Sequence, residues 1–206
     1  MSDIHGNLPA LELVLSINQT VDTFISLGDV VNYGPWSNEC VELLETINSK
    51  ILLIGNHEIN FINNYYPGEN IIAKAFHDHC IKSFNNYDKI KTYIPEYYFD
   101  NYLLKHTIND KIIFSDTELT ISQNTIIGHS HKQYISTKGN YKLINPGSVG
   151  QNRQYINLIS YILWDTDKNE FQFKNITYDV NYVISKLEGM NYPEICINYY
   201  KNKKRI

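Results

Sequence analysis

The chain has 206 residues, of which 43% are hydrophobic and 19% are charged, and these values are typical of one globular domain with a full core. The formal net charge is -4, so the chain lacks the basic surface expected of a general nucleic-acid-binding protein. No apolar run approaches about 18 residues and no signal-like segment opens the chain, which argues against a membrane span and a secretion signal.

The three cysteines are Cys40, Cys80 and Cys196, and they form no CxxC motif. Such a widely spaced, odd set favours reduced, packed thiols over a disulfide framework or a zinc site. We therefore expect a cytoplasmic protein without a membrane segment.

Strand-like and helix-like segments alternate in the first third of the chain. Asn7 is suited to cap a helix, and residues 23–27 form a short apolar strand. A second helix is expected to begin at Ser37 or Asn38, and a second buried strand covers residues 51–54. This βαβα order predicts a parallel sheet covered by helices.

Residues 59–95 depart from this order. They hold a Tyr-Tyr-Pro-Gly turn and a helical pattern over 73–84, and we interpret them as a partly helical insertion that flanks the active site. From residue 97 onward the chain is mostly strand-like, and residues 180–188 predict a closing helix. The coarse picture is an α/β fold in which two sheets have helices outside.

Short polar motifs follow the apolar strands. They are Asp3-Ile4-His5, Gly28-Asp29, Gly55-Asn56-His57, a lone His106, and Gly128-His129-Ser130-His131. Ligands of open α/β sheets gather beyond the carboxyl ends of the strands, so these side chains are expected to converge. Their mixture of nitrogen and oxygen atoms favours Mn, Fe or Zn over Ca. A carboxylate can serve two ions at once, which makes Asp29 the natural bridge in a two-metal site.

The ordered motifs resemble those of the calcineurin-like metallophosphoesterases, whose pattern is DxH, GDxx, GNH[D/E], a lone His and GHxH. Residues 28–35 and 145–151, the latter followed by Arg153, resemble the small bacterial phosphodiesterase branch. The resemblance covers nearly the whole chain. It implies a four-layer α-β-β-α sandwich of two mixed sheets flanked by helices, formed by one domain over residues 1–206.

By this resemblance the chain is a phosphoric ester hydrolase that binds two divalent ions, with Mn preferred and Fe, Zn or Ni as alternatives. The metal ligands are Asp3, His5, Asp29, Asn56, His106, His129 and His131, and Asp29 bridges the two ions. His57 binds no metal and instead stabilises the transition state or protonates the leaving oxygen. The implied reaction is attack on phosphorus by a hydroxide that bridges the metals.

Two further residues are candidates for contact with the substrate phosphate. Arg153 follows the Asn-Pro-Gly turn, and Asn7 is the weaker candidate because it is also suited to cap the first helix. Glu58 is expected either to support a ligand or to lie at the surface, and the sequence leaves both readings open.

One departure from the family pattern concerns the first motif. An apolar strand normally precedes it, but only Met1 and Ser2 precede Asp3 here. Without that strand the neighbouring strands lose a backbone partner and apolar cover. Either the sequence begins late or the chain binds the first metal weakly, and we favour the late start.

The expected substrate is a small phosphodiester, a nucleotide or a phosphomonoester. A phosphoprotein phosphatase and a dinucleoside polyphosphate hydrolase remain open, whereas the net charge disfavours a nuclease and nucleic-acid partners. The alternative function is a non-catalytic scaffold or binding protein on the same fold. The complete ligand set and His57 disfavour that alternative, and the sequence does not indicate an oligomeric state.

Overall fold

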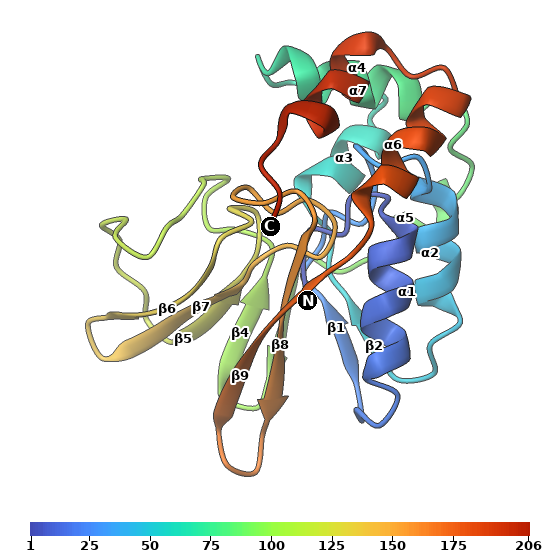
Figure 1. The fold of residues 1–206 in the computed structure, drawn as a ribbon. Coiled ribbons are helices and arrows are strands. Elements are labelled where there is room, and N and C mark those ends of the chain that lie inside the picture. The colour runs from blue at the N-terminus through green and yellow to red at the C-terminus, as the bar shows by residue number, and fades with distance from the viewer.

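The apolar segments pair into one five-stranded sheet and two smaller ladders in the computed structural model, which describes residues 1–206 (Figure 1). The five-stranded sheet has the order β3-β4-β5-β7-β6. Its strands are β3 (Glu96–Phe99), β4 (Tyr102–Lys105), β5 (Asn124–Ile127), β6 (Gln133–Lys138) and β7 (Tyr141–Pro146). The sheet is mixed, because β4, β5 and β7 run parallel and the two outer strands pair antiparallel.

The other four strands form two pairs. β1 (Phe24–Ser26) and β2 (Lys50–Leu52) are parallel, and β8 (Leu158–Asp165) and β9 (Glu170–Thr177) form an antiparallel hairpin. Leu27, Leu53, Tyr102, Leu104, Ile126 and Ile144 form a buried cluster between these strands and the five-stranded sheet. The core of the sandwich thus lies between the strands that end at the polar motifs.

The outer face of the five-stranded sheet has its own small core. Side chains alternate along a strand, so Ile127 and Leu143 point away from the inner cluster and pack with Ile113 and Tyr134. The segment 107–123 therefore covers this face, and it contains no helix.

Seven helices complete the fold. They are α1 (Leu8–Ile17), α2 (Ser37–Glu45), α3 (Asn56–Ile62), α4 (Ile71–Cys80), α5 (Tyr87–Ile90), α6 (Val180–Gly189) and α7 (Glu194–Asn202). Their apolar faces and one face of β8 form the largest core cluster. The predicted α/β fold with flanking helices is confirmed, but the helices pack on the β8 side and not on the outer face of the five-stranded sheet. Helix α7 was not expected from the sequence. No helix is long and apolar enough to cross a membrane.

The chain begins in a gap between β1 and β8 (Figure 1). The Met1 ammonium donates to the Ile25 carbonyl at 2.9 Å, and the Leu27 N–H donates to the Met1 carbonyl at 3.0 Å. On the other side, the Val149 N–H donates to the Ser2 carbonyl at 3.0 Å. Residues 1–3 thus form a very short backbone ladder that connects β1 to the segment before β8, and this ladder positions the first motif.

Candidate metal centre

The polar motifs meet at the carboxyl ends of the strands. Asp29 follows β1, Asn56 follows β2, His106 follows β4, and both His129 and His131 follow β5. Five of the seven predicted ligands have left-handed backbone conformations, namely Asp3 (φ 54°), His5 (50°), Asp29 (56°), His129 (65°) and His131 (57°). Such conformations are unfavourable for residues other than glycine and occur mainly where the surrounding structure enforces a functional geometry.

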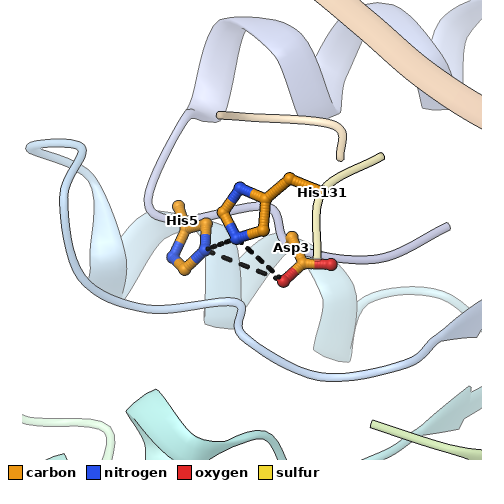
Figure 2. A group of neighbouring side chains, drawn as sticks. All are labelled: Asp3, His5 and His131. Carbon is orange, nitrogen blue, oxygen red and sulfur yellow. Dashed lines mark hydrogen bonds and ion pairs between the residues drawn. The ribbon is translucent and has the colours of Figure 1, made fainter. Parts of the chain in front are cut away.

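Asp3, His5 and His131 form the first cluster (Figure 2). All three are buried. Asp3 Oδ1 lies 3.3 Å from His131 Nε2 and 3.8 Å from His5 Nε2, and the two imidazole nitrogens are 3.2 Å apart. Asp3 Oδ1 has no hydrogen-bond donor although it is buried. Three ligand atoms therefore surround one point, and no backbone N–H group is directed at that point.

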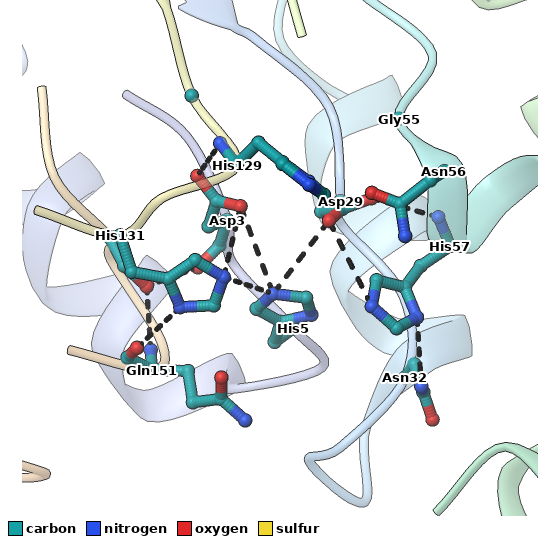
Figure 3. Close-up of polar contacts among 12 residues, drawn as sticks. Asp3, His5, Asp29, Asn32, Gly55, Asn56, His57, His129, His131 and Gln151 are labelled. Carbon is teal, nitrogen blue, oxygen red and sulfur yellow. Dashed lines mark hydrogen bonds and ion pairs between the residues drawn. The ribbon is translucent and has the colours of Figure 1, made fainter. Parts of the chain in front are cut away.

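Asp29, His106 and His129 form the second cluster. Figure 3 shows Asp29 and His129 of this cluster beside Asp3 and His5 of the first. His106 Nε2 lies 3.1 Å from Asp29 Oδ2, 3.1 Å from Asn56 Oδ1 and 3.2 Å from His129 Nδ1. Asp29 Oδ2 is also 3.9 Å from His5 Nε2 of the first cluster. The carboxylate of Asp29 thus lies between the two clusters, where a ligand shared by two ions would be.

Backbone carbonyls determine which imidazole nitrogens carry protons. Nδ1 of His5 contacts the Val31 carbonyl at 3.2 Å, and Nδ1 of His131 contacts the Gln151 carbonyl at 2.6 Å. A carbonyl only accepts, so both Nδ1 atoms carry the proton and both Nε2 atoms present lone pairs to the cluster. Two lone pairs 3.2 Å apart repel unless a cation lies between them. The donor set therefore fits a metal ion.

The same logic applies to His106. Its Nδ1 contacts the Leu27 carbonyl at 2.8 Å, which leaves Nε2 directed at Asp29 Oδ2. Burial lowers the pKa of His106, but the carboxylates of Asp29 and Asp3 overcome this effect and raise it to about 10. In the metal-free protein a proton on Nε2 therefore takes the position that a cation would occupy.

The same buried, charged surroundings shift the pKa values of Asp3 and Asp29 in opposite directions. Burial, reinforced by the charge of Asp29, raises the pKa of Asp3 to about 7. Burial would also raise the pKa of Asp29, but His106 and His57 hold it well below its usual range. Two buried carboxylates beside each other require positive charge to stay ionised together, which two divalent ions would supply.

His57 is close to Asp29 but its protonation differs from that of the ligands. Its Nδ1 lies 2.9 Å from the Asn32 side-chain nitrogen, which only donates, so Nδ1 accepts and the neutral ring carries its proton on Nε2. Nε2 lies 4.0 Å from Asp29 Oδ2, and the His57 backbone N–H donates to Asp29 Oδ1 at 2.9 Å. This tautomer presents an N–H donor to the site and not a metal-binding lone pair.

Glu58 is fully buried and supports the ligand loops. Its two oxygens accept hydrogen bonds at 2.7–3.1 Å from the backbone N–H groups of Asp29, Val30, Val31 and Gly55. Burial and the neighbouring Asp29 raise the pKa of Glu58 to about 7. Of the two readings that the sequence left open, the supporting one matches the structure. Its place at the third residue of α3 was the available signal.

The two predicted substrate contacts differ in placement. Asn7 is fully buried, caps α1 by accepting from the Ala10 N–H, and donates to the Gly150 carbonyl and to Tyr178. Its amide is engaged within the fold, so we do not retain it as a substrate contact. Arg153 is exposed and makes no hydrogen bond or ion pair with a predicted ligand, although its charge, after burial, contributes to lowering the pKa of His131 well below the usual range.

Comparisons with known proteins agree with this geometry. The family model described as calcineurin-like phosphoesterase matches residues 1–185. An uncharacterized protein of Methanocaldococcus jannaschii is 30% identical over 226 residues, covering 94% of this chain and 93% of that protein. A metallophosphoesterase structure from Sphaerobacter thermophilus has a TM-score of 0.77 at 23% identity, covering 98% and 96% of the two chains. A hypothetical protein from Pyrococcus horikoshii has a TM-score of 0.80 at 14% identity, covering 97% and 95%.

Proposed function

The chain belongs to the calcineurin-like phosphoesterase family, and we propose that it hydrolyses a small phosphate ester with the aid of two divalent ions, Mn being the preferred one. The observation that carries this proposal is the pair of clusters that share Asp29. Each cluster directs imidazole nitrogens and carboxylate oxygens at one point. The seven residues Asp3, His5, Asp29, Asn56, His106, His129 and His131 would hold the ions.

The metal ions and the protein side chains would have different roles in the reaction. When bound, two neighbouring divalent ions lower the pKa of a shared water, orient the phosphate and neutralise its growing charge. Nε2–H of His57 faces the same space, where it would donate a hydrogen bond to the phosphate or a proton to the leaving oxygen. Asn32 holds His57 in the tautomer that permits this donation.

The surroundings of the site support a small substrate with an aromatic group. The ring of Tyr66 stacks on His57 with centroids 6.4 Å apart, and it is half-buried at the site. Burial raises the pKa of Tyr66, and the positive charge of Arg153 opposes that shift and also contributes to lowering the pKa of His131. A nucleotide or an aryl phosphodiester offers both a flat ring and a phosphate to this pair.

Replacement of the shared ligand tests the proposal. Asp29→Asn keeps the size of the side chain but removes the negative charge between the clusters, and we expect hydrolysis of bis-p-nitrophenyl phosphate with added Mn to fall at least about 10³-fold. Metal analysis should show both ions lost. Asp88→Asn, at an exposed position of α5, is the control and should keep full activity. In the same assay Arg153→Met should raise KM with little change in kcat.

Two outcomes would contradict the proposal. Retained activity in Asp29→Asn would exclude a mechanism that depends on this carboxylate. An unmodified protein that binds two ions but hydrolyses none of a panel of nucleoside mono-, di- and cyclic phosphates would favour the scaffold function instead.

A further inference from the structure

Helix α7 contacts the wall of the candidate metal centre, although it lies outside residues 1–185, which the family model matches. Its Tyr199 ring packs on the ring of Tyr33, with centroids 6.1 Å apart. Tyr33 in turn contacts His5 and His57 in T-shaped arrangements, at centroid distances of 4.9 and 5.5 Å. One aromatic ring therefore separates α7 from a predicted metal ligand and from the predicted proton donor.

The backbone at Tyr33 holds this ring in a strained conformation. Its φ is 62°, in the left-handed region that a bulky residue rarely adopts. Asn32, whose side chain contacts His57, is also left-handed, with φ 74°. Such strain persists mainly where the surrounding structure enforces a functional geometry. Tyr33 is therefore a wall of the site, and Tyr199 extends this wall away from the metal ligands.

The residues that follow α7 are bonded to the loop that contains Arg153. The Ile156 N–H donates to the Lys204 carbonyl at 2.9 Å. Figure 1 shows this end of the chain, in red, running from α7 back to the loops above the strands. Lys203 is thus held against the segment that carries Arg153, and burial, together with the charge of Arg153, lowers the pKa of Lys203.

Neither of these two cations has a carboxylate partner, because the ion pairs of the chain involve other lysines. Nζ of Lys203 instead lies 4.9 Å from the centroid of the Tyr199 ring, a favourable cation–π contact. Lys203 is half-buried and Arg153 is exposed. Two cations on bonded segments that no carboxylate neutralises favour an anion beside them.

The Tyr199 hydroxyl is a donor that lacks an acceptor. It is buried and has no hydrogen-bond partner in the protein. Buried hydroxyls are nearly always paired, because an unpaired one has lost its bonds to water. Burial raises the pKa of Tyr199, and the charge of Arg153 opposes this shift without reversing it, so the hydroxyl keeps its proton at neutral pH. An acceptor supplied by a ligand would complete this position.

We propose that Tyr199 and Lys203 bind a second phosphate group of the substrate, one that is not hydrolysed. A tyrosine hydroxyl and an ammonium group are donors that phosphate oxygens accept. This inference rests on the proposed hydrolysis and specifies its substrate class, a nucleotide-type ester with a flat ring and two separate phosphates. The two phosphates must be on different parts of the molecule, because Tyr33 lies between Tyr199 and the predicted ligand His5.

Two matched substrates test this proposal on the full-length chain with added Mn. Both are p-nitrophenyl esters of thymidine 5′-phosphate, and only one carries a 3′-phosphate, so the reacting phosphate and the leaving group are identical. We expect the 3′-phosphate to raise kcat/KM at least about tenfold. Lys203→Met keeps the stem but removes the charge and should bring this ratio to about one, and Tyr199→Phe should lower it about fivefold. Lys201→Met is the control, since Lys201 is exposed on the same helix and pairs with Glu188 at 2.6 Å.

A ratio near one in the unmodified protein would overturn the proposal. So would Lys203→Met if it slowed both esters by the same factor, because a merely structural role leaves the ratio unchanged. Failure to hydrolyse either ester or bis-p-nitrophenyl phosphate would instead reject the proposed function. Calorimetry then still tests the second phosphate site: thymidine 3′,5′-bisphosphate should bind at least about tenfold more tightly than thymidine 5′-monophosphate, and Lys203→Met should abolish this difference. Equal binding of the two nucleotides to the unmodified protein would reject the site.

Discussion

The two halves of the candidate metal centre are anchored very differently. His106 and His129 of the second cluster follow β4 and β5, which have a strand partner on each side. Asp3 and His5 of the first cluster lie in a loop that is held by backbone hydrogen bonds to Gly28, Asp29 and Gly150. In both clusters the ligand atoms nevertheless lie within 4.8 Å of one another.

Local hydrogen bonds hold the loop that carries the first cluster. The Asp3 carbonyl accepts from the Gly150 N–H and the Ser148 hydroxyl, its N–H donates to the Gly28 carbonyl, and its carboxylate accepts from the His129 N–H. These bonds pair the backbone groups around Asp3 and hold its side chain in place. The difference predicts that the first half is the easier one to disrupt selectively.

Loss of the Glu58 acceptor should have the largest effect and should damage both halves together. In Glu58→Gln one of the two acceptor oxygens becomes an NH₂ group, which leaves two buried N–H groups unpaired at a cost of about 2–5 kcal/mol. Urea unfolding measures this loss, and metal analysis should show both ions depleted because Asp29 is shared. Glu39→Gln is the matched control, since Glu39 occupies the same third position of α2 but is exposed.

Selective damage to the first half should follow from Ser148→Ala. The buried Ser148 hydroxyl donates to the Asp3 carbonyl at 2.7 Å and accepts from the Gln151 N–H at 2.8 Å. Its loss should cost about 1–3 kcal/mol and weaken the first ion about tenfold while sparing the second. Ser136→Ala removes a buried hydroxyl that has no partner and should change neither quantity. Equal weakening of both ions in Ser148→Ala would show that the halves are not anchored separately.

The motifs predict a ligand set because each combines a strand end with a residue type that binds metal, and the structure brings six of these side chains into two clusters. The βαβα order and the first two helices could be predicted for a similar reason, since local apolar patterns determine them. These signals depend on a few neighbouring residues and are readable in a single sequence.

Other features depend on contacts that no local pattern encodes. The carbonyls of Val31, Leu27 and Gln151 fix the imidazole tautomers. Every residue has a backbone carbonyl, so the sequence does not indicate which carbonyls contact the histidines. The role of Asn7 was ambiguous because one amide suits both a helix cap and a phosphate contact, and only its bonds to Gly150 and Tyr178 distinguish them. One side of the ladder of residues 1–3 pairs Ser2 with Val149 and Asp3 with Gly150, more than 140 residues apart, and no local pattern predicts such a pairing.

The smallest expected difference between the two halves is in the pH dependence of their affinities for metal ions. Each ion must displace whatever proton its ligands hold in the metal-free protein. Asp3, with its pKa raised to about 7, is protonated below that pH, so affinity for the first ion should rise about tenfold per pH unit up to pH 7 and then level off. His106, with its pKa raised to about 10, keeps its proton throughout this range, so affinity for the second ion should continue to rise beyond pH 7.

The pKa of His106 also determines how the stability of the metal-free fold changes with pH. A raised pKa of His106 stabilises the metal-free fold fully below pH 6.5, and this contribution is lost as the pH rises through about 10. Mn competition titrations from pH 5.5 to 9 would measure both affinities, and His106→Asn should remove the rise above pH 7 because its amide holds no titrating proton. Parallel pH profiles for the two ions would mean that Asp3 and His106 titrate as one unit through Asp29, and the centre would then have to be treated as a single site.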